Sequence, residues 1–211
     1  SNREHTYVHS EPIDTRREAD EAVKALGYNG QYFVDADHIN LSTVDRFVAV
    51  SDFFTLDVAS FIGKPSAQED IDTFIASCEK YMGELQIPGM EKPLSITKEL
   101  LEDIANKFLS ATQQASEIYA YLVDKKGVGN FITEVSMDEV EKPQTPVEML
   151  FILKMLADKG VPAQTIAPKF TGRFNKGVDY VGNLEQFAKE FEEDVLVIDF
   201  AVKEFGLPAE L

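Results

Sequence analysis

The second half of the chain alternates between strand patterns and helix patterns at a nearly regular spacing. Residues 130–136 and 163–168 are short apolar segments that resemble strands, whereas residues 145–158 and 183–205 repeat apolar side chains at the helical period. A strand, a helix and a second strand in this order form a parallel crossover unit. The alternation therefore predicts an α/β fold built on a parallel sheet.

The first half of the chain is less regular. Residues 97–125 carry an apolar stripe at helical spacing, which predicts a long helix whose stripe belongs to the core. Shorter helices are predicted over residues 16–26 and 66–82, and a strand over residues 31–40. Residues 41–62 fit either a second strand or a buried helix, because a short apolar run has no decisive period.

The predicted strands are too few for a complete (β/α) barrel, which typically needs about 250 residues, whereas this chain has 211. Both ends look cut, because the chain starts without Met and ends on a phrase that normally leads from a helix into a strand. We therefore expect a TIM-barrel-like (β/α) fold in which the barrel is incomplete, with an open doubly wound sheet as the alternative. Residues 1–14 are polar and without pattern, which predicts an arm or linker. Residues 15–211 would then form a single α/β barrel-type domain, truncated at one or both ends.

The composition supports a folded core and argues against several partners. Apolar residues make up 44% of the chain and include 15 Phe, so a sizeable core is expected. The net charge of -17 disfavours nucleic acid and anionic membrane surfaces, although local Lys and Arg could still hold a small anionic substrate. No apolar run approaches the roughly 20 residues of a membrane span. The single cysteine, Cys78, fits a reducing compartment, and we expect a cytoplasmic protein.

The predicted strand at residues 31–40 ends in Asp35, Asp37 and His38. Ionisable side chains are costly inside a strand without partners, so we expect the strand to emerge at the rim of the sheet, where α/β folds build their sites. Alternation places Asp35 and Asp37 on one face and His38 on the other, and a bend in the backbone could bring His38 and one Asp together. Capping of a following turn is the alternative interpretation of the two carboxylates.

A second carboxylate, Glu134, lies in the middle of the predicted strand at residues 130–136. It is either the partner of a structural salt bridge or a general acid–base or metal-ligating group with a pKa tuned by burial. Asp138 lies beyond the strand, where helix capping or solvation is expected.

A third polar segment follows the strand at residues 163–168. Lys169, Arg173 and Lys176 gather there in an otherwise acidic chain. Basic side chains on a glycine-bearing loop suit a carboxylate or phosphate, although a solvated loop that balances nearby acids remains the alternative. Asp179, just beyond this cluster, could ligate a metal or tether Lys176.

Three phrases, at residues 35–39, 53–59 and 168–180, together resemble the tagaturonate/fructuronate epimerase family. They occur in order and span most of the chain, which makes the resemblance more specific than any single motif. The resemblance implies a barrel-type enzyme that uses a divalent metal cation to interconvert D-tagaturonate and D-fructuronate, two keto sugar acids of hexuronate breakdown. It also implies a longer chain, with a further metal-binding histidine beyond Leu211.

Within this resemblance, the polar strand ends can be given roles. We expect Glu134 to be the acid–base residue. Asp37 is placed with it among the catalytic residues, either as a second ligand of the metal or as the group that orients the metal-binding His38. His38 and Asp179 are the metal candidates. The loop side chains Lys169 and Arg173 would hold the substrate carboxylate, and Asp35 would contact the substrate.

Two other functions fit the same residues. One is a different metal-dependent sugar isomerase or aldolase on the same barrel, and the other is a non-catalytic module that binds sugar acids. Acid and base groups at several strand ends favour an enzyme. The expected partner is a small anionic sugar acid, and a homo-oligomer is compatible with these observations.

Overall fold

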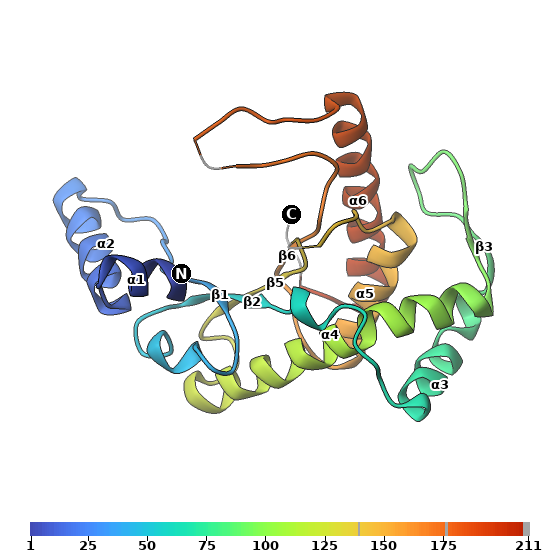
Figure 1. Ribbon diagram of the computed structural model, residues 1–211, viewed down its shortest axis with the longest axis horizontal. Coiled ribbons are helices and arrows are strands. Elements are labelled where there is room, and N and C mark those ends of the chain that lie inside the picture. The colour runs from blue at the N-terminus through green and yellow to red at the C-terminus, as the bar shows by residue number, and fades with distance from the viewer. Residues whose placement is uncertain (139, 176, 209–211) are drawn as a thin grey trace.

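The computed structural model describes residues 1–138, 140–175 and 177–208. Its main feature is a four-stranded parallel sheet in the order β1-β2-β5-β6 (Figure 1). The four strands are β1 (Asp35–Ile39), β2 (Phe53–Asp57), β5 (Ile132–Ser136) and β6 (Thr165–Ala167). A separate antiparallel hairpin consists of β3 (Gly83–Leu85) and β4 (Leu94–Ile96). The strand order of the main sheet follows the chain, without a reversal.

Six α-helices accompany the two sheets in the described residues. They are α1 (Asn2–Val8), α2 (Pro12–Leu26), α3 (Gln68–Ser77), α4 (Lys98–Lys126), α5 (Pro146–Asp158) and α6 (Leu184–Phe205). Local signals fix the ends of the longer ones. The Thr97 side chain caps α4, and Thr145 forms a capping box with Glu148 at the start of α5. The Asn183 side chain caps α6 by accepting a hydrogen bond from the backbone N–H of Gln186. Among the described residues, no helix is both long and apolar enough to span a membrane.

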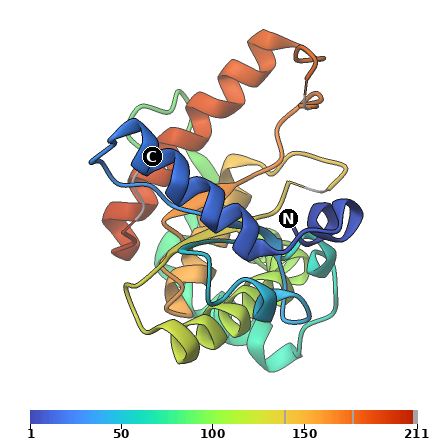
Figure 2. The same ribbon diagram turned by 90° about the vertical axis from the view of Figure 1, so that its left-hand side faces the viewer.

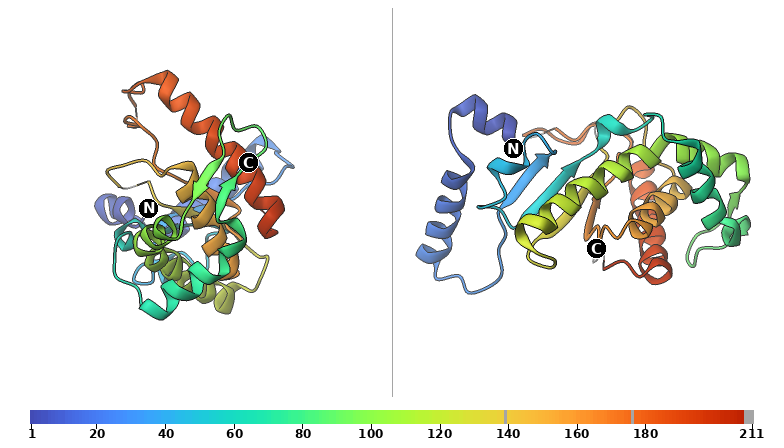
Figure 3. Two further views of the ribbon diagram at one scale, coloured as in Figure 1. Left: turned by 90° about the vertical axis from the view of Figure 1, so that its right-hand side faces the viewer. Right: turned by 90° about the horizontal axis from the view of Figure 1, so that it is seen from below.

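Helices α4 and α5 lie on one side of the main sheet, as the view from below shows for α4 (Figure 3). Helix α2 lies beyond β1 and crosses in front of the sheet when the molecule is turned to that side (Figure 2). The segment from β6 to α6 rises on the side opposite to α4 (Figure 1). Helices α4 and α5 therefore cover one face of the sheet.

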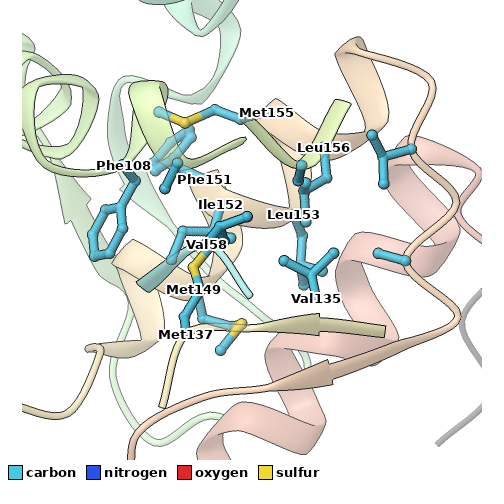
Figure 4. Close-up of a cluster of buried hydrophobic side chains, with 14 of the residues drawn as sticks. Val58, Phe108, Val135, Met137, Met149, Phe151, Ile152, Leu153, Met155 and Leu156 are labelled. Carbon is cyan, nitrogen blue, oxygen red and sulfur yellow. The ribbon is translucent and has the colours of Figure 1, made fainter. Parts of the chain in front are cut away.

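The hydrophobic core fills the layer between the sheet and α4 and α5. Figure 4 shows Val135 of β5 and Val58 beside β2 facing a cluster of α5 side chains, with Phe108 of α4 at its margin. All three are fully buried. Each such side chain contributes about 1.5–3 kcal/mol when it leaves water. The core members labelled in the figure are Val58, Phe108, Val135, Met137, Met149, Phe151, Ile152, Leu153, Met155 and Leu156.

The prediction of an α/β fold with parallel strands is confirmed. The sheet is open, however, and a closed barrel is not seen in the described residues. The ambiguous segment at residues 41–62 contains β2, flanked by the short 3-10 turns Val44–Arg46 and Ala59–Phe61. The prediction of one continuous helix over residues 66–82 was too long, because α3 ends at Ser77.

The segment at residues 1–14, for which the sequence predicts an arm or linker, is largely helical, because it contains α1 and the start of α2. Helix α1 has no buried residue, so it shows no apolar period in the sequence. Its start is held by a local capping box between Ser1 and Glu4. Helix α2 begins at Pro12 rather than at residue 16, since proline is well tolerated in a first turn.

Candidate functional site

The carboxyl ends of the four parallel strands meet at one edge of the main sheet. Strand β1 brings Asp37 and His38 to this edge, β2 brings Asp57, and the segment after β5 brings Asp138. Parallel α/β sheets build their sites at this edge, because the loops that follow the strands converge there.

An irregularity in β1 orients the His38 side chain towards Asp37. The pairing of β1 with β2 shifts register between Ala36 and Ile39, and His38 adopts a left-handed backbone with φ of 55°. A bulge of this kind re-aims a side chain that strict alternation would place on the opposite face. As a result, His38 Nδ1 lies 2.5 Å from Asp37 Oδ1, and the expected convergence of His38 with one Asp is confirmed.

The other nitrogen of the His38 ring faces a second carboxylate. His38 Nε2 lies 3.7 Å from Asp138 Oδ1, which is an ion-pair distance rather than a hydrogen bond. The Ser136 hydroxyl donates to the same oxygen, Asp138 Oδ1, at 2.7 Å. Asp138 therefore lies at the site, whereas the sequence suggested capping or solvation. Its position just after β5 was the only available signal.

These two carboxylates make the site attractive to cations. Asp138, and then Asp37, raise the pKa of His38 to about 9, although partial burial of the ring opposes the shift. In turn, the imidazolium holds the pKa of Asp138 below its usual value. The cluster of Asp37, His38 and Asp138 therefore favours positive charge between its carboxylates.

A second polar group crosses the face of the sheet that α4 and α5 leave uncovered. Glu134, in the middle of β5, pairs in register with Thr55 on β2 and with Thr165 on β6. The Thr165 hydroxyl donates to Glu134 Oε2 at 2.9 Å, and Thr55 Oγ1 lies 3.4 Å from Glu134 Oε1. On its other side, Thr55 Oγ1 lies 3.3 Å from each oxygen of Asp35. We refer to Asp35, Thr55, Glu134 and Thr165 as the polar row.

Asp35, at the β1 end of the polar row, has an altered ionisation although it remains exposed. Crowding by surrounding protein atoms raises its pKa to about 6, and the charges of Asp37 and Glu134 add to this effect. The hydrogen bond from Thr55 opposes the shift, because it stabilises the ionised form. At neutral pH, Asp35 is therefore close to the range in which it exchanges its proton.

A pocket of about 720 Å³ adjoins Asp37 and His38. Asp57 lines it from β2, Phe174 lines it from the loop after β6, and Arg3 lines it from α1. Arg3 is exposed and was missed in the sequence, because it lies in the segment interpreted as an arm. The pocket is thus lined both by acidic side chains at the strand ends and by a cationic side chain from α1.

The basic loop after β6 is only partly at the site. Lys169 lines a pocket of about 380 Å³ together with Asp138 and Phe174. The backbone of Arg173 pairs with Val181, and the residue is exposed on the loop. Asp179 is likewise exposed, and it does not line the pocket beside His38. Lys176 lies outside the described residues.

The cluster offers a partial ligand set for a metal ion. Among the described residues, no group of three or more His, Cys, Asp or Glu side chains is arranged to hold one. The Nε2 atom of His38 and Oδ1 of Asp138 nevertheless lie 3.7 Å apart, as two neighbouring ligands of one cation can. Asp37 binds the other ring nitrogen, which is the usual arrangement behind a metal-bound imidazole. The donor chemistry therefore fits a divalent cation, with further ligands required.

A parallel sheet with ionisable side chains gathered at the carboxyl ends of its strands is characteristic of an α/β enzyme domain. The family described as UxaE, tagaturonate epimerase, matches residues 1–204 of this chain. The chain therefore belongs to the tagaturonate epimerase family, as the resemblance of its three phrases suggested.

Individual relatives agree with this assignment. A tagaturonate/fructuronate epimerase from Thermotoga maritima is 29% identical over 178 residues, which cover 79% of this chain and 36% of that protein. A glycerol-complexed crystal structure of the fructuronate-tagaturonate epimerase UxaE from Cohnella laeviribosi has a TM-score of 0.69 at 22% identity, and it covers 88% of this chain and 40% of its own. The native structure of that enzyme gives a TM-score of 0.64, with 86% and 39% covered. The chain thus spans well under half the length of these relatives, and the structural likeness shows the fold alone.

Proposed function

We propose that this chain carries the catalytic groups of an epimerase that interconverts D-tagaturonate and D-fructuronate. The observation that supports this proposal is the family match along residues 1–204, which includes both the His38 cluster and the polar row. The substrate would be a small anionic keto sugar acid, which is compatible with an acidic chain only if local cations hold its carboxylate.

Glu134 would be the base of this reaction. In a retro-aldol route, it takes the proton of the hydroxyl on the carbon to be inverted, and the adjacent carbon–carbon bond breaks to leave an aldehyde and an enediolate. The aldehyde then turns its other face, the bond forms again, and Glu134 returns the proton to the new hydroxyl. Direct removal of a proton beside the carbonyl would use the same residue. Asp37 would assist by holding His38 in one orientation.

A divalent cation would be held by His38 through Nε2 and by Asp138, with Asp37 fixing the ring from behind. Such a cation supplies Lewis acidity that stabilises negative charge on the substrate oxygens. A role of Asp179 as a further ligand remains a prediction, as does the identity of the ion.

The substrate carboxylate would be held by basic side chains near the two pockets. Lys169 has the better position of the two loop residues, because it shares a pocket with Asp138, whereas Arg173 would need the loop to approach the sheet. Arg3 is a further candidate, since it lines the pocket beside His38 and a guanidinium can form a bidentate pair of hydrogen bonds with a carboxylate. Asp35 would accept a hydrogen bond from a substrate hydroxyl.

We further propose that the four parallel strands are a segment of a TIM-barrel-like (β/α) fold. The strand order supports this, because it follows the chain without the reversal that marks a doubly wound sheet. A cytoplasmic location is proposed with it, since the single Cys78 is buried and free.

The function is tested by incubating the purified protein with D-tagaturonate and a series of divalent cations and following the products by NMR. We expect D-fructuronate, and we expect Glu134→Gln and His38→Ala to lose it, with His38→Ala also losing bound metal by elemental analysis. Cleavage fragments or an aldose would point instead to an aldolase or an isomerase. Thermal stabilisation by the sugar acid without turnover would point to a binding module.

A further inference from the structure

Within the polar row, Glu134 is contacted by a threonine on each side. Thr165 Oγ1 donates to one carboxylate oxygen of Glu134 at 2.9 Å, and Thr55 Oγ1 lies 3.4 Å from the other. These hydroxyls come from the two strands that flank β5, in register with Glu134 itself. Both oxygens of one carboxylate are thus contacted by hydroxyl groups of the neighbouring strands.

Threonine is well suited to fix the position of such a carboxylate. Its branched Cβ restricts rotation about χ1, so the hydroxyl position is set by the strand backbone rather than by a flexible side chain. Thr55 is only 2% exposed, which restricts it further. A free glutamate, in contrast, samples many rotamers and loses considerable entropy when it is ordered. The two threonines therefore supply the order that Glu134 lacks by itself.

Thr55 has an additional contact, with Asp35. Its Oγ1 lies 3.3 Å from each oxygen of Asp35, so a single hydroxyl stands between the carboxyl groups of β1 and β5. One hydroxyl has one proton and donates to one carboxylate at a time. It can accept a hydrogen bond from the other carboxyl group when that group is protonated. Thr55 therefore connects the hydrogen bonding of Asp35 to that of Glu134.

We propose that Thr55 and Thr165 are positioning residues that hold the Glu134 carboxylate in its reactive orientation, with Thr55 also linking it to Asp35. The inference rests on the proposed role of Glu134 as the base of an epimerase. It adds that catalysis depends on two hydroxyl groups that are not themselves acids or bases. Loss of either hydroxyl should lower the rate of the chemical step more than the affinity for substrate, because misplacement of a catalytic group costs rate.

The chain provides a matched control on the same strand. Thr133 precedes Glu134 on β5, and its side chain is fully buried on the face of the sheet that packs against the helices. Its hydroxyl has no hydrogen-bond partner among the residues that the structure describes. Replacement by valine at this position removes a hydroxyl from β5 while the shape of the side chain is conserved.

The test compares Thr55→Val, Thr165→Val and Thr133→Val with Thr55→Ser in the purified protein, with kcat and KM measured separately. We expect the first two substitutions to lower kcat by roughly 10- to 100-fold with KM changed by less than about threefold. Thr133→Val should leave kcat unchanged, and Thr55→Ser should restore most of it, because serine keeps the hydroxyl. Crystal structures of the variants give a second readout, in which the Glu134 carboxylate is displaced in Thr55→Val and stays in place in Thr133→Val.

The possible results separate the inference from the function on which it rests. An unchanged kcat in both Thr55→Val and Thr165→Val, while Glu134→Gln is inactive, overturns the positioning role and leaves the epimerase intact. A similar fall in Thr133→Val overturns it too, because the effect would then be general to β5. If the wild-type protein does not epimerise, the proposed function fails, and an undisplaced Glu134 carboxylate in Thr55→Val would still overturn the inference.

Discussion

A buried carboxyl group outside the His38 cluster should make the stability of the protein depend on pH. Asp194, on α6, is 6% exposed and lines an apolar pocket of about 290 Å³ together with Leu153, Phe191 and Ile198. Burial, with added repulsion from Glu190 and Glu193, raises its pKa from the ordinary value of 3.8 to about 7. The folded protein therefore binds a proton at Asp194 over a pH range in which the unfolded chain has already released it.

The sign and size of the effect follow from this difference in pKa. Asp194 favours the folded state fully below the unfolded pKa, and this contribution is lost as the pH rises towards the folded pKa of about 7. A difference of roughly three pKa units corresponds to an upper limit of about 4 kcal/mol. Between pH 5 and pH 8 the loss would be about 3 kcal/mol, a large part of the ~5–15 kcal/mol that stabilises a typical domain.

The substitution Asp194→Asn isolates this contribution, because an amide has nearly the same shape and no titration in this range. We expect the free energy of unfolding of Asp194→Asn, relative to wild type, to rise by about 2–3 kcal/mol between pH 5 and pH 8 in urea titrations. Asp199→Asn is the control, since Asp199 lies on the same helix, pairs with Lys203 and is half exposed. A difference between Asp194→Asn and wild type that stays constant over this pH range would refute the reasoning.

Two further predictions concern the substrate pocket and the core. Arg3→Ala should raise KM for the sugar acid by about tenfold in a steady-state assay, because a contact to the substrate carboxylate is lost. Arg17→Ala, on the exposed surface of α2, should leave KM unchanged in the same assay. An equal KM in both variants would remove Arg3 from the substrate site. Phe108→Ala should lower the free energy of unfolding by about 3–5 kcal/mol in urea titrations, because Phe108 is fully buried on α4. Phe33→Ala, at a side chain that is 48% exposed, should lower it far less, and equal losses would contradict the core assignment.

The parts of the fold that the sequence predicts well are those with both a local signal and a buried face. Helix α4 has a capping Thr97 at one end, Gly127 at the other and an apolar stripe between them, so its bounds are predicted within a residue or two. Helix α1 has a capping box but buries none of its residues, and the periodicity that reveals a helix is therefore missing. Hydrophobic periodicity in a sequence reveals a helix with a buried face, and it does not reveal a helix such as α1 that is stabilised by its capping interactions.

The residues of the candidate site likewise include some that the sequence predicts and some that it does not. Asp37, His38 and Glu134 were identified because charged side chains in or after a strand are unusual, and the structure brings Asp37 and His38 together. Asp138 was underestimated, since whether a residue just after a strand faces a partner depends on the neighbouring strand. Thr55 carries no chemistry of its own, and its role depends on register, which a single sequence does not reveal.

Strand register also determines how the two polar groups of the site are arranged. Strand β5 contributes Glu134 to the polar row. Ser136 lies two residues further along the same face of β5, roughly 7 Å away, and its hydroxyl donates a hydrogen bond to Asp138. Strand β1 repeats this pattern, with Asp35 in the polar row and Asp37 beside His38. A slip of either strand by one residue would turn both sets of side chains into the apolar core, where the burial of unpaired carboxylates is energetically costly. The packing of Val135 against α5 therefore fixes the register of the sheet and, with it, the separation between Glu134 and the cluster of Asp37, His38 and Asp138.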